Sequence, residues 1–278
     1  PSLYIAMFRL IGAAAVLTLP TLMRHRNELS VLNRRQWGLA TISGMFLAAH
    51  FAFWNLSLEY TTVLVSVTLV STTPLFAALS EWLFLRQLPR NVVLIGMVFA
   101  IGGGILLAIP VDISNVSAST SGDNDLLGGV LALLGAVAMA AYLTIGRSLR
   151  ANLALLPYIW IVYGIGGLVM LPVLFAQDVP LTGYSVNGYL WLIALALIPQ
   201  LIGHSSLNYA VKYLSATYIS VTTKLEPIVS AAIAFFAFSE IPNRWEITGS
   251  AIILTGVLVA SLPKRNRMRA SKPIGTTL

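Results

Sequence analysis

Two charged residues stand at the centre of an apolar run in this sequence, where an ionised side chain would be costly. Lys224 and Glu226 lie midway along the run from Leu214 to Phe238. If that run crosses a membrane, an ionised side chain at its centre costs about 2.5–3.5 kcal/mol on insertion scales, and such residues mark functional sites by default. The ammonium group of Lys224 could hold a carboxylate or phosphate of a substrate, or exchange a proton. The carboxylate of Glu226 could carry a coupling proton.

These two side chains cannot both face one cavity squarely. Residues two positions apart on a helix point roughly 200° away from each other, so we favour Lys224 as the cavity residue. Lys224 could instead form an internal ion pair with Glu226 or with a carboxylate on a neighbouring helix. Glu226 precedes Pro227, and a proline frees a backbone carbonyl about four residues upstream. Glu226 therefore has a structural interpretation as well as a functional one.

Arg9 and two histidines also lie inside apolar runs. Arg9 could attract an anion or form a structural ion pair. His50 and His204 lie near the centres of their runs and could hydrogen-bond a substrate, carry a proton or join two helices. Amide and aromatic side chains in these runs could contact a substrate or could be packing residues: Trp54, Asn55, Asn208, Trp160 and Tyr163.

The residues that other kinds of chemistry need are missing. The sequence contains no cysteine, which excludes disulfides, thiol catalysis and thiolate metal sites. Histidines and carboxylates are not spaced as metal ligands, and the sequence has no HExxH, GxSxG or glycine-rich phosphate loop. We therefore expect no metal, no cofactor and no enzymatic activity.

The composition is that of a membrane protein. Of the 278 residues, 57% are hydrophobic and 10% are charged, against about 25% charged in a soluble protein. Apolar runs of about 18 residues or more predict membrane helices, and a barrel is disfavoured because its strands would alternate polar and apolar residues. The prediction is an all-α polytopic membrane protein with nine spans, at about Leu3–Met23, Gln36–Tyr60, Thr61–Leu85, Asn91–Ile109, Leu126–Ser148, Leu153–Phe175, Tyr189–Tyr213, Leu214–Phe238 and Trp245–Leu262.

The stretch from Asn55 to Gly103 occurs twice, which predicts two repeats. Pro74 and Gly96 return 153 positions later as Pro227 and Gly249, and other prolines, glycines and tyrosines follow at the same offset without a gap. Apolar matches would mean little in so hydrophobic a chain, but matched proline and glycine positions indicate a duplicated unit. A duplicated helix bundle is typical of transporters built from two repeats.

The second half holds five predicted spans and the first half four. We infer that one helix of the natural protein precedes Pro1 and is missing here; the alternative is that nine spans are real and the repeat is imperfect. The predicted units are a first repeat over residues 1–110, an outside linker over 111–125, a second repeat over 126–263 and a basic cytoplasmic tail over 264–278.

Charges in the connections predict the orientation. Basic and acidic connections alternate along the chain, and lysine and arginine mark the cytoplasmic side. The net charge of +7 is explained by these connections, so we expect no nucleic-acid partner. Glu59 in the first copy corresponds to Lys212 in the second, and Arg86 corresponds to Ser239. This exchange of charge indicates that the second repeat is inverted, and the C-terminus is predicted to be cytoplasmic.

The duplicated segments resemble a known transporter superfamily. FWNLSLEYTTVLVSVTLVSTTPLFAALSEWLFLRQLP and NYAVKYLSATYISVTTKLEPIVSAAIAFFAFSEIP resemble the EamA type of the drug/metabolite transporter superfamily, and YIAMFRLIGAAAVL around Arg9 is similar to its second helix. The resemblance implies ten helices in two inverted five-helix units with a central cavity between them. It also implies carriage of amino acids, nucleotide-linked compounds, drugs or similar small molecules.

The leading hypothesis is a secondary transporter that moves a small polar metabolite by alternating access. The resemblance favours export of an amino acid or related compound. The alternatives are an exchanger of nucleotide-linked or other anionic metabolites, favoured by Lys224 and Arg9, and an exporter of organic cations that uses Glu226. A membrane enzyme or scaffold is disfavoured, because the polar residues lie near the midplane. The expected partners are a small-molecule substrate, the lipid bilayer and, as a further candidate, a coupling proton; the expected location is a bacterial cytoplasmic membrane, and no oligomeric state is predicted.

Overall fold

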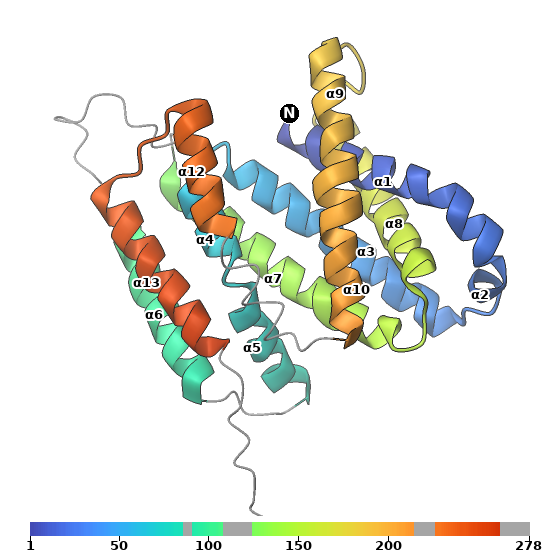
Figure 1. Cartoon of the computed structure of the whole chain (residues 1–278), viewed down its shortest axis with the longest axis horizontal. Helices are drawn as coiled ribbons and strands as arrows, with labels where there is room; N and C mark the ends of the chain where they lie inside the picture. The colour runs from blue at the N-terminus through green and yellow to red at the C-terminus, as the bar shows by residue number, and fades with distance from the viewer. Residues whose placement is uncertain (86–90, 108–123, 214–225, 262–278) are drawn as a thin grey trace, which may run out of the picture.

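A computed structural model describes residues 1–85, 91–107, 124–213 and 226–261, and the regular elements in those residues are all helices (Figure 1). This confirms the prediction of an all-α protein. Lys224, the basic tail and the predicted linker up to residue 123 lie outside the described residues, and Asp125, predicted to end the linker, begins α7. In chain order the helices are α1 (Ser2–Arg24), α2 (Arg26–Ser30), α3 (Arg34–Ser57), α4 (Val63–Val70), α5 (Thr73–Leu85), α6 (Asn91–Leu107), α7 (Asp125–Arg150), α8 (Leu155–Ala176), α9 (Val186–Leu195), the π-helix η2 (Ala196–His204), α10 (Ser205–Tyr213), α12 (Glu226–Phe238) and α13 (Arg244–Ala260).

The predicted spans correspond to these helices. In the described part of the chain, 6 helical stretches are long and apolar enough to cross a membrane, and α6, α12 and α13 match the remaining predicted spans. Two spans are composite: α4 and α5 together form one, and α9, η2 and α10 together form another. The molecule is therefore a polytopic membrane protein, as predicted.

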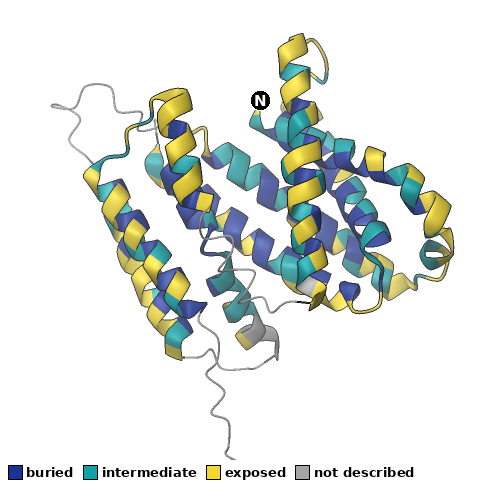
Figure 2. Cartoon of the chain, viewed as in Figure 1, coloured by how far each residue is buried: buried dark blue, intermediate teal, exposed yellow. Residues whose placement is uncertain are grey.

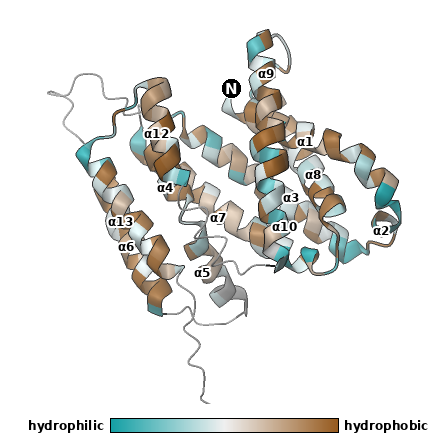
Figure 3. Cartoon of the chain, in the orientation of Figure 1, coloured by the Kyte–Doolittle hydropathy of each residue, from teal (hydrophilic) through white to brown (hydrophobic). Residues whose placement is uncertain are grey.

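The outer surface of the bundle is apolar, as a lipid-facing surface must be. Exposed residues run along the outer faces of α9, α12 and α13 (Figure 2), and these faces are largely hydrophobic (Figure 3). Phe236 on α12 is 83% exposed and Trp191 on α9 is 72% exposed. Lipid tails are as apolar as these side chains, so turning the side chains inward would gain no hydrophobic stabilisation. Polar side chains that serve a function are therefore expected in the interior.

Two apolar cores lie inside the bundle, and α7 takes part in both. The first core gathers side chains of α1, α3, α7 and α8, including Leu10, Phe51 and Tyr142. The second gathers side chains of α4, α5, α6, α7 and α13, including Ala132 and Ile253. Because α7 supplies Tyr142 to the first core and Ala132 to the second, it connects the two parts of the molecule (Figure 1).

Helices α6 and α13 are repeat mates that pack against each other at glycines. A Cβ atom on Gly96 would lie 2.5 Å from the carbonyl oxygen of Gly256, and one on Gly103 would lie 2.6 Å from that of Gly249. Residue numbers rise on one helix as they fall on the other, so the two helices run antiparallel. Three successive glycines, Gly102, Gly103 and Gly104, suggest close helix packing in the sequence, and the structure shows it only at Gly103. A Cβ atom on Gly102 or on Gly104 would have nothing within 4 Å.

The break between α4 and α5 is stabilised by threonines next to Pro74. Proline cannot donate to the carbonyl four residues upstream, which here belongs to Val70. The hydroxyl of Thr73 donates to that carbonyl at 2.7 Å, and the hydroxyl of Thr72 donates to the carbonyl of Leu69 at 2.6 Å. These threonines therefore satisfy the backbone at this proline, as a buried carbonyl in lipid requires an internal partner.

The two ends of the bundle hold different connections. In the view of Figure 1, the C-terminal ends of α7 and α10 lie toward the bottom, whereas the start of α9 and the α12–α13 connection lie at the top. At the top, a carboxylate oxygen of Glu240 accepts a hydrogen bond from the backbone N–H of Val63 at 3.1 Å. Glu240 thereby caps the start of α4 from a distant part of the chain.

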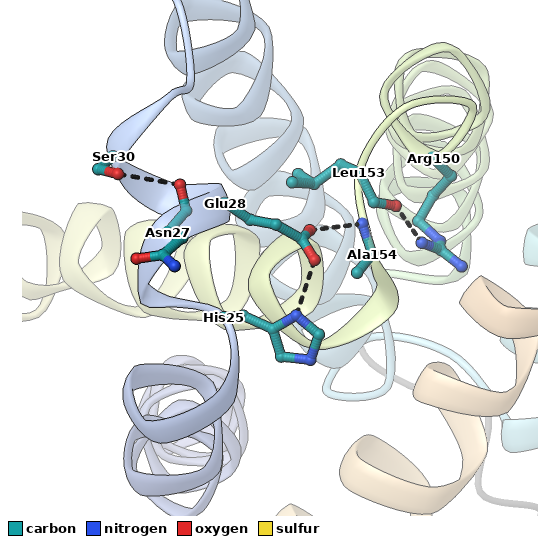
Figure 4. Close-up of polar contacts among 7 residues, drawn as sticks. All are labelled: His25, Asn27, Glu28, Ser30, Arg150, Leu153 and Ala154. Carbon is teal, nitrogen blue, oxygen red and sulfur yellow. Dashed lines mark hydrogen bonds and ion pairs between the residues drawn. The ribbon is translucent and has the colours of Figure 1, made fainter.

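A second carboxylate caps a helix on the opposite side. Glu28 on α2 accepts a hydrogen bond from the backbone N–H of Ala154, the N-cap of α8, at 3.2 Å (Figure 4). Its other oxygen accepts one from the His25 ring at 2.8 Å. Beside it, Arg150 donates to the carbonyl of Leu153, which closes the turn between α7 and α8. Short polar contacts therefore hold the α1–α3 connection against the α7–α8 turn.

The glycine contact predicts that two alanine substitutions on α6 differ in their effect on stability. Gly96→Ala places a methyl group against the backbone of α13, and overpacking of this kind costs about 1–3 kcal/mol. Gly102→Ala meets no neighbour and should be neutral or stabilise α6 by about 0.5–1 kcal/mol. Thermal unfolding of the two variants in one detergent measures the difference. Equal melting temperatures would show that α6 and α13 do not pack at Gly96.

The Glu28 contact predicts a loss of stability in acid. The hydrogen bond from His25 lowers the pKa of Glu28 below its usual value of 4.5, with a smaller contribution from the N–H of Ala154. A lowered pKa stabilises the folded state above the usual value, and the contribution is lost as the pH falls through the lowered one. The melting temperature of the wild type should therefore exceed that of Glu28→Gln at pH 6, and the gap should close toward pH 3. A gap independent of pH would contradict this interpretation.

Candidate functional site

The π-helix η2 interrupts a membrane-spanning stretch and contains Pro199. Proline lacks an N–H and crowds the preceding turn, and π-helical turns are frequent at functional sites. Gln200 in this segment is fully buried, and His204 at its end has a buried ring nitrogen, Nδ1. The irregular segment therefore directs two polar side chains into the protein interior.

Arg9 on α1 meets this segment from the other side. Its side chain is only 5% exposed. One guanidinium N–H donates to Oε1 of Gln200 at 3.5 Å, and the guanidinium carbon lies 4.4 Å from the centre of the Phe51 ring. The charge of Glu226, at the start of α12, also interacts with that of Arg9. Arg9 is thus a buried cation placed among α1, α3, η2 and α12.

The two histidines predicted as candidates are brought together. The ring centres of His50 and His204 are 6.4 Å apart, and His204 meets the edge of Phe51 at 5.0 Å. His50 also stacks on Trp54, with ring centres 5.7 Å apart. Its Nδ1 lies 2.9 Å from the carbonyl oxygen of Gly135. Because a carbonyl only accepts, Nδ1 carries the hydrogen, and α7 thereby orients the ring.

Asn208 anchors the end of the same helix. Its amide oxygen accepts from the hydroxyl of Tyr142 at 2.7 Å, and its amide nitrogen donates to the hydroxyl of Tyr163 at 3.4 Å. The amide nitrogen also donates to the backbone carbonyl of His204 at 2.8 Å. Nε of Arg150 donates to the backbone carbonyl of Asn208 at 3.3 Å. Asn208 therefore ties α10 to α7 and α8, which is the structural role that sequence reasoning had set beside a binding role.

Two sequence candidates lie apart from this cluster. The side chain of Asn55 donates to the carbonyl of Phe51 on its own helix at 2.8 Å. The indole of Trp160 donates to the hydroxyl of Thr18 at 2.9 Å, in a shallow groove between α1 and α8 that also contains Trp37. The structure therefore brings together Arg9, His50, Trp54, Tyr163, His204 and Asn208, with Glu226 at the edge.

A groove between α4, α5, α6 and α7 lies elsewhere and has a different character. It has a volume of about 410 Å³, and its walls are mostly apolar side chains such as Leu69, Phe76 and Ile101. Such walls suit a lipid chain better than a polar solute. The polar cluster is therefore the candidate functional site, because polar side chains at membrane depth mark functional sites.

Comparison with known proteins now identifies the class of molecule. The EamA-like transporter family matches residues 1–109 and 126–262, which together make up most of the chain. The chain belongs to the EamA-like transporter family. This confirms the resemblance read from the duplicated segments, and it agrees with the expectation of a transporter.

Several relatives of this EamA-like transporter are themselves transporters. The uncharacterized transporter YdfC of Bacillus subtilis (strain 168) is 24% identical over 95% of this chain and 83% of its own length. The pseudopaline exporter CntI of Pseudomonas aeruginosa (strain UCBPP-PA14) is 24% identical over 95% of this chain and 88% of its own. A solved crystal structure aligns with a TM-score of 0.64 at 17% identity, over 94% of this chain and 87% of that one. That likeness concerns the fold alone.

Several buried polar atoms in the cluster of this EamA-like transporter have no hydrogen-bond partner among the described residues. They are Nε of Arg9, Nε2 of Gln200, Nε1 of Trp54 and Nδ1 of His204. An unsatisfied buried donor costs about 1–3 kcal/mol, and the cost is not lower in a membrane interior, where water is scarce. Such a group of donors at one place is expected where a ligand completes the contacts. The described residues hold no cluster of three or more potential metal ligands.

Sequence reasoning missed Gln200 and Phe51 in this EamA-like transporter. Gln200 is a polar residue near the middle of the predicted span Tyr189–Tyr213, and that position was the available signal. Phe51 gave no signal, because its role depends on its contact with Arg9 across two helices. The π-helical register that turns Gln200 inward also depends on tertiary packing.

The hydrogen bonds of Asn208 predict an unequal effect of two related substitutions. Asn208→Ala leaves the hydroxyl of Tyr142 and other buried groups unpaired, at a cost of about 1–3 kcal/mol. Asn55→Ala, at the matching position of the first repeat, removes one bond within a helix and should cost less. Thermal unfolding in detergent compares them. Equal destabilisation would mean that Asn208 does not join α10 to α7 and α8.

Proposed function

We propose that this EamA-like transporter is a secondary transporter that exports a small polar metabolite, an amino acid or a related compound, across the cytoplasmic membrane by alternating access. The observation that carries the proposal is the polar cluster around Arg9 and Gln200. It lies inside membrane-spanning helices, away from their ends, and its donors lack partners among the described residues. Polar groups held at that depth mark a substrate pathway.

The arrangement of repeat-related helices supports alternating access. Transporters with inverted repeats expose a central site to each side in turn, as one repeat takes the conformation of the other. Here α6 and α13 are repeat mates that cross antiparallel at matched glycines, Gly96 against Gly256 and Gly103 against Gly249. Glycine contacts let the backbones approach without interlocking side chains. This contact is suited to act as the pivot between the two halves.

A relative and the positions of basic residues support the direction of transport and the orientation. The relative CntI is an exporter of pseudopaline, which favours export here without naming a substrate. Basic residues such as Arg150 and Lys212 occur at helix ends that gather on one side of the bundle, and basic connections face the cytoplasm. The C-terminus would then also be cytoplasmic.

A second candidate is an exchanger of anionic metabolites, and the burial of Arg9 favours it. Arg9 presents a positive charge inside the bundle, and Lys224 would add another if it faces the same cavity. Glu226 keeps its proposed role as a carboxylate that takes up a coupling proton. It is exposed at the start of α12 and its charge interacts with that of Arg9, so protonation of Glu226 would change the charge of the site.

Lys224→Ala tests the residue that sequence analysis favoured most. The purified full-length protein is reconstituted in liposomes and assayed with radiolabelled amino acids, nucleotides, sugar phosphates and organic cations. We expect the wild type to move an amino acid or related compound, and Lys224→Ala to lose most of that transport. Lys212→Ala is the matched control, because Lys212 is an exposed lysine at the end of α10. Transport at the wild-type rate by Lys224→Ala would remove Lys224 from the site.

Substrate binding can be measured separately from transport in the same preparation. A ligand at about 100 times its dissociation constant stabilises a protein by about 2.7 kcal/mol if it binds only the folded state. Stabilisation by amino acids or anions that is absent in Lys224→Ala would support the leading proposal or the exchanger. Stabilisation by organic cations alone, unchanged in Lys224→Ala, would instead favour a cation exporter that relies on Glu226.

A further inference from the structure

We infer that Arg9 and Gln200 form a binding site for the carboxylate group of the transported molecule. The inference rests on the proposed transport function and names the chemical group that the polar cluster recognises. It also moves the main anion contact from Lys224, which sequence reasoning favoured, to a pair of side chains on α1 and η2.

The first argument is the type of atom left without a partner. Nε of Arg9, Nε2 of Gln200 and Nε1 of Trp54 have no hydrogen-bond partner among the described residues. All three can only donate. A ligand that satisfies them must present acceptors, and a ligand that is itself rich in donors would leave them unpaired.

The second argument is the charge and shape of the guanidinium group. Arg9 is fully ionised at neutral pH and offers donors in a planar fork that matches the two oxygens of a carboxylate. One of its terminal N–H groups already contacts Oε1 of Gln200 at 3.5 Å. With Oε1 turned toward Arg9, the amide keeps its N–H₂ group as a second donor, and the side chain of Gln200 also contacts the hydroxyl of Tyr163. Arg9 and Gln200 thus supply donors from two helices that contact each other.

The third argument is that the fork is held in place. The guanidinium carbon lies 4.4 Å from the centre of the Phe51 ring, and stacking on an aromatic face favours a parallel guanidinium plane. Phe51 is itself fully buried and meets the edge of His204 at 5.0 Å. A preorganised donor loses less conformational entropy when it binds. Arg9 is therefore positioned before the ligand arrives.

The residues around Arg9 favour a ligand that carries one negative charge next to an apolar or aromatic group. The charge of Glu226 interacts with that of Arg9, so a dianion such as a phosphate ester would meet more repulsion from Glu226 than a monocarboxylate would. His50, Trp54 and His204 provide rings beside Arg9 and Phe51. A ligand with one carboxylate and a flat or apolar remainder fits this environment. An ammonium group on the same ligand could face Glu226.

The test compares acids with their amides on the purified full-length protein in detergent. The probes are the protein amino acids and a set of simple monocarboxylates, each paired with the corresponding primary amide. We expect at least one acid to raise the melting temperature of the wild type and its amide to have no effect. Arg9→Gln should lose this response, and Arg9→Lys, which keeps the charge without the fork, should bind the acid about tenfold more weakly. Trp54→Phe should weaken binding, whereas Trp191→Phe on the exposed face of α9 should not.

Gln200→Glu keeps the test decisive if the Arg9 variants fail to fold. It places a carboxylate of the protein beside Arg9, so the empty variant should melt at a higher temperature than the wild type and should no longer respond to the acid. A residue with a merely structural role would not produce both effects. The inference is overturned if the amide binds as well as the acid, if Gln200→Glu still binds the acid, or if none of the acids binds.

The same proteins in liposomes separate this inference from the proposed function. Transport of an amino acid, organic cation or phosphate compound that is unaffected by Arg9→Lys would leave the transporter proposal standing and remove the carboxylate site. Absence of transport for every class of compound by the wild type would contradict the proposed function itself.

Discussion

The absence of water in a bilayer is the constraint on which this structure depends. Every buried polar group must find a partner inside the protein, and most of the described ones do. The hydroxyl of Thr73 donates to a carbonyl that Pro74 leaves free. The amide oxygen and the amide nitrogen of Asn208 both form hydrogen bonds. Among the described residues, unpaired hydroxyls such as those of Thr68 and Ser250 occur singly, whereas the unpaired nitrogens of Arg9, Gln200, Trp54 and His204 belong to one cluster. This grouping supports the proposal that a ligand completes their contacts.

The polar cluster and the α6–α13 contact lie in different regions of the molecule. Helices α1, α3 and α8, with the segment α9–η2–α10, surround the polar cluster, and α6 with α13 forms a smooth glycine-lined contact at the other end of the bundle (Figure 1). Helix α7 contributes to both cores. In the proposed alternating access, a change of angle at the α6–α13 contact would reach the cluster through α7. His50 would take part in that coupling, since its ring is hydrogen-bonded to the backbone of α7 at Gly135.

The sequence predicts what depends on local pattern, and it fails where several helices meet. Long apolar runs located the spans, and the resemblance of the duplicated segments to the EamA type predicted the family that the comparison shows. The role of Gln200 and the separation of Trp160 from the cluster depend on the π-helical register and on which face of α8 meets α1. The mid-span position of Gln200 was the only signal in the sequence for its role, and the sequence had none for the separation of Trp160.

Accessibility of the polar cluster from each side of the membrane is the most direct test of the central claim. The sequence has no cysteine, so a single Ser205→Cys substitution beside Tyr163 reports on the cluster. A charged, membrane-impermeant thiol reagent is applied to right-side-out and to inverted vesicles. Alternating access predicts labelling from both sides, protection by the transported molecule, and no labelling of Trp191→Cys on the exposed apolar face of α9. Labelling from one side only, or from neither, would contradict a central site that opens in turn to each face.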